Sequence, residues 1–160
     1  RFSTIPAYNS IFLPSKARGA GANSVGSGTN HMRSASCVPD AETACLLDGR
    51  FEVKVQWTDF TALSGPAKLM YFGAERAESD QSAFFWFFNS TNFEMGVKMV
   101  DACVAPFNRY WVFVSGLTSQ QYLVRVTNMD TLDEQTYFNP LNNLPTTEGD
   151  TQAFACDPTR

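Results

Sequence analysis

Hydrophobic and polar residues alternate along much of the chain after residue 36, which is the pattern of strands with one buried and one solvent-facing side. The clearest case is 51–58, where Phe51, Val53, Val55 and Trp57 alternate with polar residues. Turns rich in Gly, Pro, Asn and Asp separate the predicted strands, which are 51–58, 67–73, 82–89, 92–101, 110–115, 121–128 and 134–139. A spacing of about 8–14 residues is typical of an all-β sandwich or barrel, and no window shows a convincing helical period.

The first 36 residues differ in composition from the rest of the chain. They contain no cysteine, and they begin with an alternating apolar stretch, 4–14, followed by a Gly-, Ser- and Asn-rich spacer, 19–30. Because Pro6 and Pro14 lack an amide donor, an extended stretch here is an edge or inserted strand. We therefore predict an N-terminal arm, 1–36, ahead of an antiparallel immunoglobulin-like β-sandwich, 37–160.

The arm suggests a way to assemble. Twelve spacer residues span roughly 40 Å when extended, so the strand can reach a neighbouring subunit and complete a sheet edge or groove there. A head-to-tail contact of this kind produces a fibre. The expected interface residues on the strand are Ile5, Tyr8, Ile11, Phe12 and Leu13, and the expected groove lies beside the aromatic run 84–88, with Phe85 and Phe87. Two alternatives stay open: the strand packs on its own domain, or the segment links to another domain.

Four cysteines lie outside any metal-binding spacing, and the chain has a single histidine, His31. Two disulfides in an oxidising compartment are therefore expected, and a zinc site is not. We predict Cys37–Cys156, because domain termini tend to lie close together. That leaves Cys45–Cys103.

Composition narrows the range of partners. Of the 160 residues 44% are hydrophobic and only 18% are charged, and the net charge is −4. This balance argues against binding to nucleic acid, which needs clustered Lys and Arg. The chain has no apolar run long enough to span a bilayer. It begins with Arg, so it is interpreted as a processed chain or an excised fragment.

Candidate chemistry is sparse. No nucleophile elbow, phosphate-binding loop or metalloprotease motif is present, and His31 lies alone in the Gly- and Ser-rich segment. Asp130 and Asp133 could offer oxygens to calcium, but calcium loops are denser in Asp, Asn and Gly. A solvated turn is the preferred interpretation. Asn89-Ser90-Thr91 fits the N-glycosylation pattern and is equally interpreted as a turn. We expect no enzyme activity, cofactor or metal.

Four pieces carry a family resemblance: CLLDGRFEVKVQW, FWFFNSTNFEMGVKMVDAC, RYWVF and YLVRVTNMDT. Together they resemble an uncharacterised β-rich domain that recurs in predicted secreted bacterial proteins, with the pattern FWFF, Asn-x-Glu, VK and Asp-x-Cys. The resemblance covers about 45–156. It departs at Ala102, where Gly is expected, and in the turn 131–133. It implies an extracellular bacterial β-domain and says nothing of catalysis.

Two functions from different classes follow. The first is a structural subunit of a secreted bacterial filament or surface assembly that polymerises by strand insertion, with copies of itself as partners. The second is an extracellular carbohydrate-binding or adhesion module, in which exposed aromatic rings would stack on a glycan. The candidate rings for this role are Trp86, Trp111, Tyr110 and Tyr122, although each lies in an apolar alternation that also suits a core.

Overall fold

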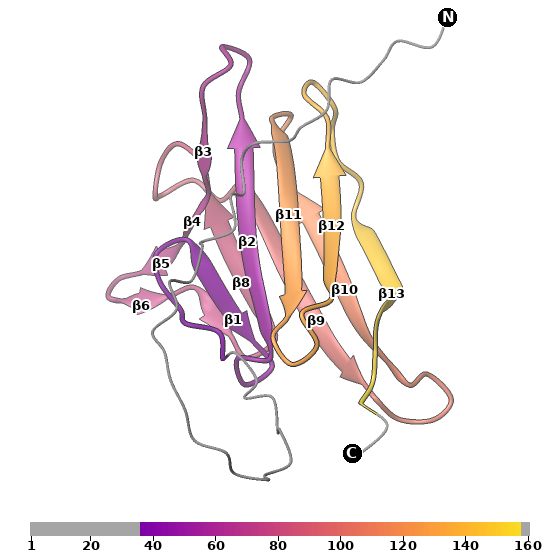
Figure 1. The fold of residues 1–160 in the computed structure, drawn as a ribbon. Coiled ribbons are helices and arrows are strands. Elements are labelled where there is room, and N and C mark those ends of the chain that lie inside the picture. The colour runs from indigo at the N-terminus through magenta and orange to yellow at the C-terminus, as the bar shows by residue number, and fades with distance from the viewer. Residues whose placement is uncertain (1–35, 158–160) are drawn as a thin grey trace, which may run out of the picture. The chain divides into compact units, whose positions relative to one another are not determined.

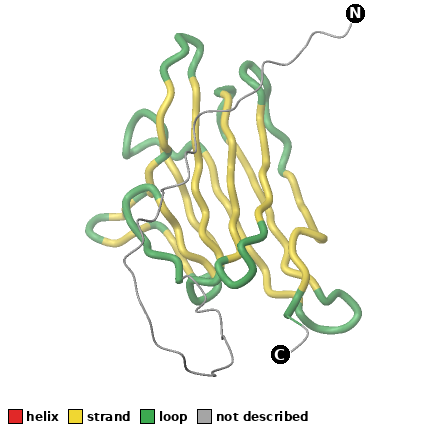
Figure 2. The backbone as a smooth tube through the Cα atoms, viewed as in Figure 1, coloured by secondary structure: helices red, strands yellow, loops and turns green. Residues whose placement is uncertain are grey.

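The structure is a computed structural model that describes residues 36–157, in which every regular element is a β-strand (Figures 1 and 2). All strand pairs are antiparallel. The predicted antiparallel all-β class is therefore confirmed. The predictions for Ile5, Tyr8, Ile11, Phe12, Leu13 and the spacer concern residues outside the described range.

Two large sheets and a short ribbon make up the fold. The first sheet has the order β1 (Thr43–Leu46), β2 (Phe51–Thr58), β11 (Gln121–Asn128) and β12 (Glu134–Asn139), and β3 (Ser64–Pro66) also pairs with β2. The second has the order β13 (Glu148–Ala155), β10 (Arg109–Gly116), β9 (Met95–Ala102), β8 (Ser82–Trp86) and β4 (Lys68–Leu69), and β7 (Glu78–Ser79) also pairs with β8. The ribbon joins β5 (Tyr71–Phe72) to β6 (Glu75–Arg76).

The two large sheets share one hydrophobic core. At one end, the ring of Phe51 on β2 lies 5.0 Å from the rings of Tyr110 on β10 and Phe154 on β13. At the other end, Trp57 and Tyr122 of the first sheet contact Phe87, which follows β8 of the second. Burial of each large apolar side chain contributes about 1.5–3 kcal/mol, so these contacts hold the two sheets together.

The order of the strands differs from that of an immunoglobulin sheet, so the immunoglobulin-like arrangement that we predicted is not confirmed. In the immunoglobulin sheet A-B-E-D, edge strand D precedes its neighbour E along the chain. Here edge strand β12 follows its neighbour β11, and β8, β9 and β10 form a meander with β13 beside β10. Alternation shows which residues are buried but not which strands are neighbours, so this order was not derivable from the pattern.

The two sides of this double layer are closed to different degrees. On the β1 side, backbone hydrogen bonds connect the layers, such as the bond of 2.8 Å that Leu69 N–H donates to Ala41 O. On the opposite side, β12 and β13 are the last strands of their sheets, and side-chain bonds cross between them, as where Gln135 Nε2 donates to Ala153 O at 2.9 Å. Among the described residues, no backbone hydrogen bond joins the outer edge of either strand to a further strand. We call this the open side.

Most of the predicted strands are found, and the differences have simple causes. The predicted strand 67–73 is divided into β4 and β5, and the β5–β6 ribbon turns at Gly73, whose φ is +68°. Five strands were missed: β1, β3, β6, β7 and β13. The first four are only two to four residues long, and β13 (EGDTQAFA) is a polar edge strand with little alternation.

The predicted disulfide pairing is wrong: the bonds are Cys37–Cys45 and Cys103–Cys156. The segment before β1 folds back on the β1–β2 hairpin, where Cys37 N–H donates to Gly49 O, and Cys45 is therefore the nearby thiol. Strand β10 pairs with β9 on one side and β13 on the other, so Cys103 and Cys156 follow the ends of its two flanking strands. The prediction of two disulfides is confirmed.

Candidate functional site

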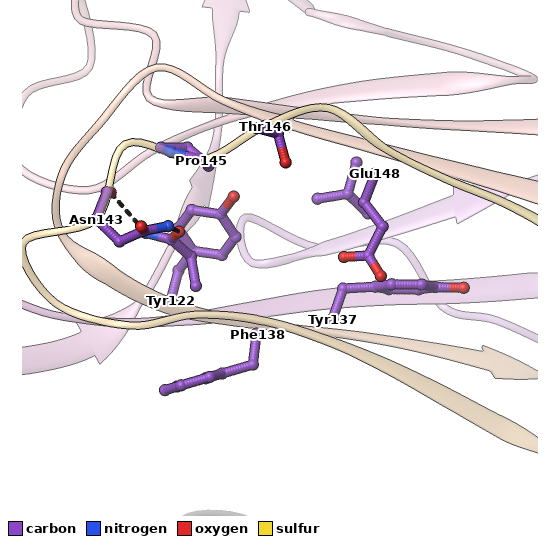
Figure 3. Close-up of a pocket in the computed structure, with 9 residues that line it drawn as sticks. Tyr122, Tyr137, Phe138, Asn143, Pro145, Thr146 and Glu148 are labelled. Atoms are coloured by element: carbon purple, nitrogen blue, oxygen red, sulfur yellow. Dashed lines mark hydrogen bonds between the residues drawn. The ribbon is translucent and has the colours of Figure 1, made fainter.

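A pocket of about 110 Å³ opens on the open side, where β12 ends and β13 begins (Figure 3). Its wall comes from β10, β11, β12, the start of β13 and the connection between β12 and β13. The lining residues are Val114, Tyr122, Tyr137, Phe138, Asn139, Asn143, Pro145, Thr146 and Glu148. Polar side chains from four parts of the sequence therefore meet at one corner of the fold.

Tyr122 and Asn139 are the most deeply buried polar residues that line the pocket. Tyr122 lies on the inward face of β11 and is only 4% exposed, and its hydroxyl points toward the side where Thr146 and Glu148 lie (Figure 3). Tyr122 Oη is not one of the buried side-chain atoms of residues 36–157 that are left without a hydrogen-bond partner. Burial, together with the Glu148 carboxylate, raises the pKa of Tyr122 to about 12. The hydroxyl is therefore neutral near pH 7 and keeps its proton as a hydrogen-bond donor.

Gly116, at the end of β10, makes room for this arrangement. A Cβ atom at this position would lie 2.7 Å from the Tyr122 hydroxyl oxygen and 2.7 Å from Cγ of Pro145. Such distances are far shorter than ordinary contacts, so any other residue would push the tyrosine or the loop away. The glycine thus allows Tyr122 to lie close under the connection between β12 and β13.

Glu148 gives the pocket its charge. It is the only acidic or basic residue among those that line the pocket. Tyr137 O–H donates to Asp150 Oδ2 at 3.1 Å. Burial first, and then the carboxylates of Asp150 and Glu148, raise the pKa of Tyr137. Both tyrosines keep their protons, so the pocket carries a net negative charge.

Asn139 and Asn143 fix the connection that covers the pocket. Asn143 Nδ2 donates to Asn139 Oδ1 at 2.8 Å, and Asn139 Nδ2 donates to Asn143 O at 3.2 Å. Three apolar side chains in this part of the chain are exposed: Phe138 is 55% exposed, Leu141 37% and Leu144 80%.

A second surface of interest is the outer face of the second sheet, which carries aromatic rings. Phe113 covers Gly149, whose added Cβ would lie 3.1 Å from that ring, and Trp111 lies edge-on to both Phe107 and Phe113. The Phe84 ring covers Gly96 in the same way. Rings that replace missing side chains on a sheet are a known way to stabilise glycine in strands, so this face has a structural role of its own.

Several sequence-predicted residues lie in other places than expected. Phe85 and Phe87, which were expected beside a groove, are buried in the core of the described body. Tyr110 and Tyr122 are also core residues and cannot serve as a flat sugar platform.

Two of the candidate rings remain partly exposed, and both are held in place. Trp86 Nε1 donates to Leu69 O at 3.2 Å. The ring of Trp111 packs against Phe107, with 5.1 Å between the ring centroids. Of the four rings considered for glycan stacking, these two are therefore the ones that a ligand could reach.

The acidic turn is a network of side-chain contacts. Arg50 forms an ion pair with Asp130 at 3.2 Å, and Thr131 O–H donates to Asp133 at 2.8 Å. No group of three His, Cys, Asp or Glu side chains suited to a metal occurs among residues 36–157.

The glycosylation pattern also lies in a turn. Asn89 Oδ1 accepts hydrogen bonds from the backbone N–H of Thr91 at 3.0 Å and from its hydroxyl at 2.9 Å. The asparagine side chain therefore closes the turn after β8, as the sequence pattern indicated.

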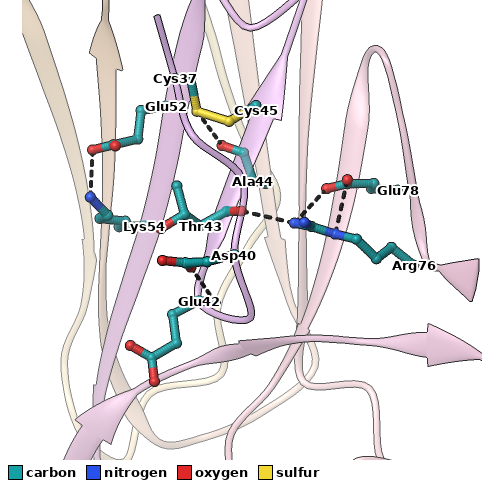
Figure 4. The surroundings of a disulfide bond; sticks show 10 residues. All are labelled: Cys37, Asp40, Glu42, Thr43, Ala44, Cys45, Glu52, Lys54, Arg76 and Glu78. Carbon is teal, nitrogen blue, oxygen red and sulfur yellow. Dashed lines mark hydrogen bonds and ion pairs between the residues drawn. A yellow bond between two sulfur atoms is a disulfide. The ribbon is translucent and has the colours of Figure 1, made fainter.

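The surroundings of the Cys37–Cys45 bond show how the opposite side of the fold is closed (Figure 4). Arg76 reaches from β6 to donate to Thr43 O at 2.8 Å, and it pairs with Glu78 at 3.0 Å. These contacts tie β1 to the second sheet. In the part of the chain that the structure describes, no comparable backbone bonding closes the β12–β13 side.

No protein-family model matches the chain, and no curated protein or solved structure is significantly similar to it. The resemblance to a secreted bacterial domain therefore stays a prediction. Within residues 36–157 no helix has the length and hydrophobicity needed to cross a membrane. The pocket residues Tyr137, Asn143 and Glu148 were missed from the sequence because they meet only when β12 and β13 lie at the same side, and no local motif marks that.

Proposed function

We propose that the chain is a structural subunit of a secreted bacterial filament or surface assembly, in which the N-terminal arm of one copy adds to the open side of the next. The observation that carries this proposal is the difference between the two sides of the double layer. The β1 side is closed by backbone hydrogen bonds between the layers. The β12–β13 side ends in two edge strands that have no further strand partner among the described residues.

Unpaired edges are the surfaces to which an extended segment can add by backbone hydrogen bonds. β12 and β13 have six and eight residues, which is long enough to pair with the apolar stretch 5–13. Because Phe85 and Phe87 already fill the core, the added strand pairs with an edge and does not replace a missing core strand. This changes the mode of assembly from insertion to edge addition.

Both disulfides suit a non-reducing, extracellular type of environment. One fastens the start of β1, and the other joins the end of β9 to the end of β13, away from the pocket at the start of β13. The body is therefore covalently fixed at positions that leave β12 and the start of β13 accessible. A subunit that must survive outside the cell and still offer an edge benefits from this distribution.

Size-exclusion chromatography with light scattering at rising protein concentration tests the proposal. We expect the full chain to form oligomers, and we expect deletion of residues 1–14, or the substitution Ile11→Asp, to leave a folded monomer. Ser24→Asp is the matched control, because it adds the same charge in the spacer and should assemble like the unmodified chain. An Ile11→Asp chain that assembles normally would show that the arm is not the connecting element.

The aromatic outer face of the second sheet favours one alternative, an extracellular carbohydrate-binding or adhesion module. Trp111 and Phe113 are partly exposed on β10, and Trp111 stands beside Phe107, which is 52% exposed. Under this alternative the full chain is monomeric at every concentration and binds glycans, and Trp111→Ala abolishes that binding. The same experiments therefore separate the two functions.

A further inference from the structure

Charge is distributed unevenly between the arm and the body. Residues 1–35 contain four basic side chains, Arg1, Lys16, Arg18 and Arg33, and no acidic one. Residues 36–157 contain sixteen acidic side chains and seven basic ones. The net charge of −4 thus hides a positive segment and a strongly negative body, which attract each other.

The open side is where this negative charge meets an unfilled pocket. The carboxylate of Glu148 lies at the pocket, and the Tyr122 hydroxyl faces the same hollow (Figure 3). Glu148 is the only acidic or basic residue that lines the pocket, so its charge is not balanced by another lining side chain. Oxygen acceptors around a negative pocket suit an ammonium or a guanidinium group.

We propose that this pocket receives a basic side chain, Lys16 or Arg18, from the N-terminal segment of a second copy of the chain. The inference rests on the proposed function, since it names the place at which the arm of one subunit binds the next. It adds the docking position, the chemistry of recognition and the direction of the added strand.

The position of the two basic residues fits the start of β13. A strand that pairs antiparallel to β13 has its C-terminal end beside Glu148, where β13 begins. Lys16 follows Leu13 by three residues, so the apolar stretch runs along the edge and the basic residues arrive at the pocket. Extended chain advances about 3.3 Å per residue, which puts Lys16 within about 10 Å of the end of the stretch.

Charge opposes the pairing of one open side with another. Such a pairing would bring the carboxylates of Glu148 and Asp150 of one copy close to those of another, and like charges across strands are destabilising. Charged residues on edge strands suppress this kind of contact. A basic segment is attracted to the same edge, so the pocket selects the arm over another body.

The test is carbodiimide cross-linking of the full chain, prepared as an equal mixture of unlabelled and ¹⁵N-labelled protein. Carbodiimide joins a lysine ammonium to a carboxylate that touches it, with loss of water, and mass spectrometry then distinguishes links within a chain from links between chains. We expect a link of mixed isotopes between Lys16 and Glu148. In the variant Arg18→Lys, the lysine introduced at position 18 can form a link of the same kind.

Two substitutions complete the design. Glu148→Gln should remove the link and weaken association about two- to fivefold, as expected for a partly exposed ion pair. Glu134→Gln is the matched control at the same edge, where Glu134 already pairs with Arg125 at 2.8 Å.

The outcomes separate this inference from the proposed function. Assembly that depends on residues 1–14, without a link to Glu148 in either protein, overturns the pocket inference and leaves strand addition standing. A link to Glu148 with one isotope only places the arm on its own body, which overturns both the second copy as occupant and the filament proposal. Equal loss of association in Glu134→Gln and Glu148→Gln shows a general charge effect and also overturns the pocket.

Discussion

At the scale of single residues, Gly116 and Tyr122 determine whether the corner pocket exists. Tyr122 lies at one of the buried positions of β11, where buried and exposed residues alternate. Its hydroxyl still reaches the pocket, because β10 ends in Gly116, which has no side chain to block it. Alternation correctly predicted that Tyr122 is buried but could not show that one end of it remains open. That information lies in a contact between β10, β11 and the β12–β13 connection.

Gly116→Ala tests this contact. The added methyl group would overlap the Tyr122 hydroxyl and Pro145, each at 2.7 Å. Overpacking of this kind costs about 1–3 kcal/mol, so we expect the free energy of unfolding in urea to fall by that amount. Gly65→Ala is the control, because its Cβ would make only an ordinary 3.7 Å contact with Trp57. Equal stability of the two variants would contradict the described position of Tyr122.

At the scale of elements, the sequence predicts the central strands well and the edges poorly. β2, β11 and β12 have the predicted bounds. Buried and exposed residues alternate along β2 and β11, and Asn and Asp mark the turns that flank β12. β13 escaped prediction because an edge strand at the open side has few buried positions, and β1 because it is short. The pairing of cysteines failed for a related reason: it depends on which strands are neighbours, and alternation does not reveal that.

The two disulfides differ in the length of chain that they close. Cys37–Cys45 spans 8 residues and Cys103–Cys156 spans 53. In the chain-entropy model these loops are worth about 2.5 and about 4 kcal/mol. We therefore expect the double variant Cys103→Ala/Cys156→Ala to lose more stability in urea than Cys37→Ala/Cys45→Ala. The reverse order, or a Cys37–Cys156 peptide in a non-reducing digest, would contradict the pairing.

At the scale of the whole molecule, the described body is closed on one side and open on the other, and the charges of arm and body are opposite. The arm alone suggested assembly, but the sequence placed the receiving site at Phe85 and Phe87, which are core residues. The open side could not be predicted, because it results from the order of strands in both sheets. The described body thus moves the expected contact from an aromatic groove to an acidic edge.

Hydrogen exchange of the edge strands tests the central claim, that the arm pairs with the open side of a neighbouring copy. Amides on the outer edges of β12 and β13 have no strand partner in the described body, whereas those of β10 and β11 are flanked by strands on both sides. If the arm adds to β13, peptides covering 148–155 become protected as the concentration of the full chain rises, whereas peptides covering 134–139 gain protection only if it adds to β12. Protection of β10 and β11 stays constant and serves as the internal reference.

The decisive comparison is between the full chain and the chain without residues 1–14, at the same concentration. The account predicts that the deletion returns the protected edge peptides to fast exchange without changing β10 or β11. Slow exchange of those peptides in the deleted chain, or fast exchange of both edges in an assembled full chain, would contradict it.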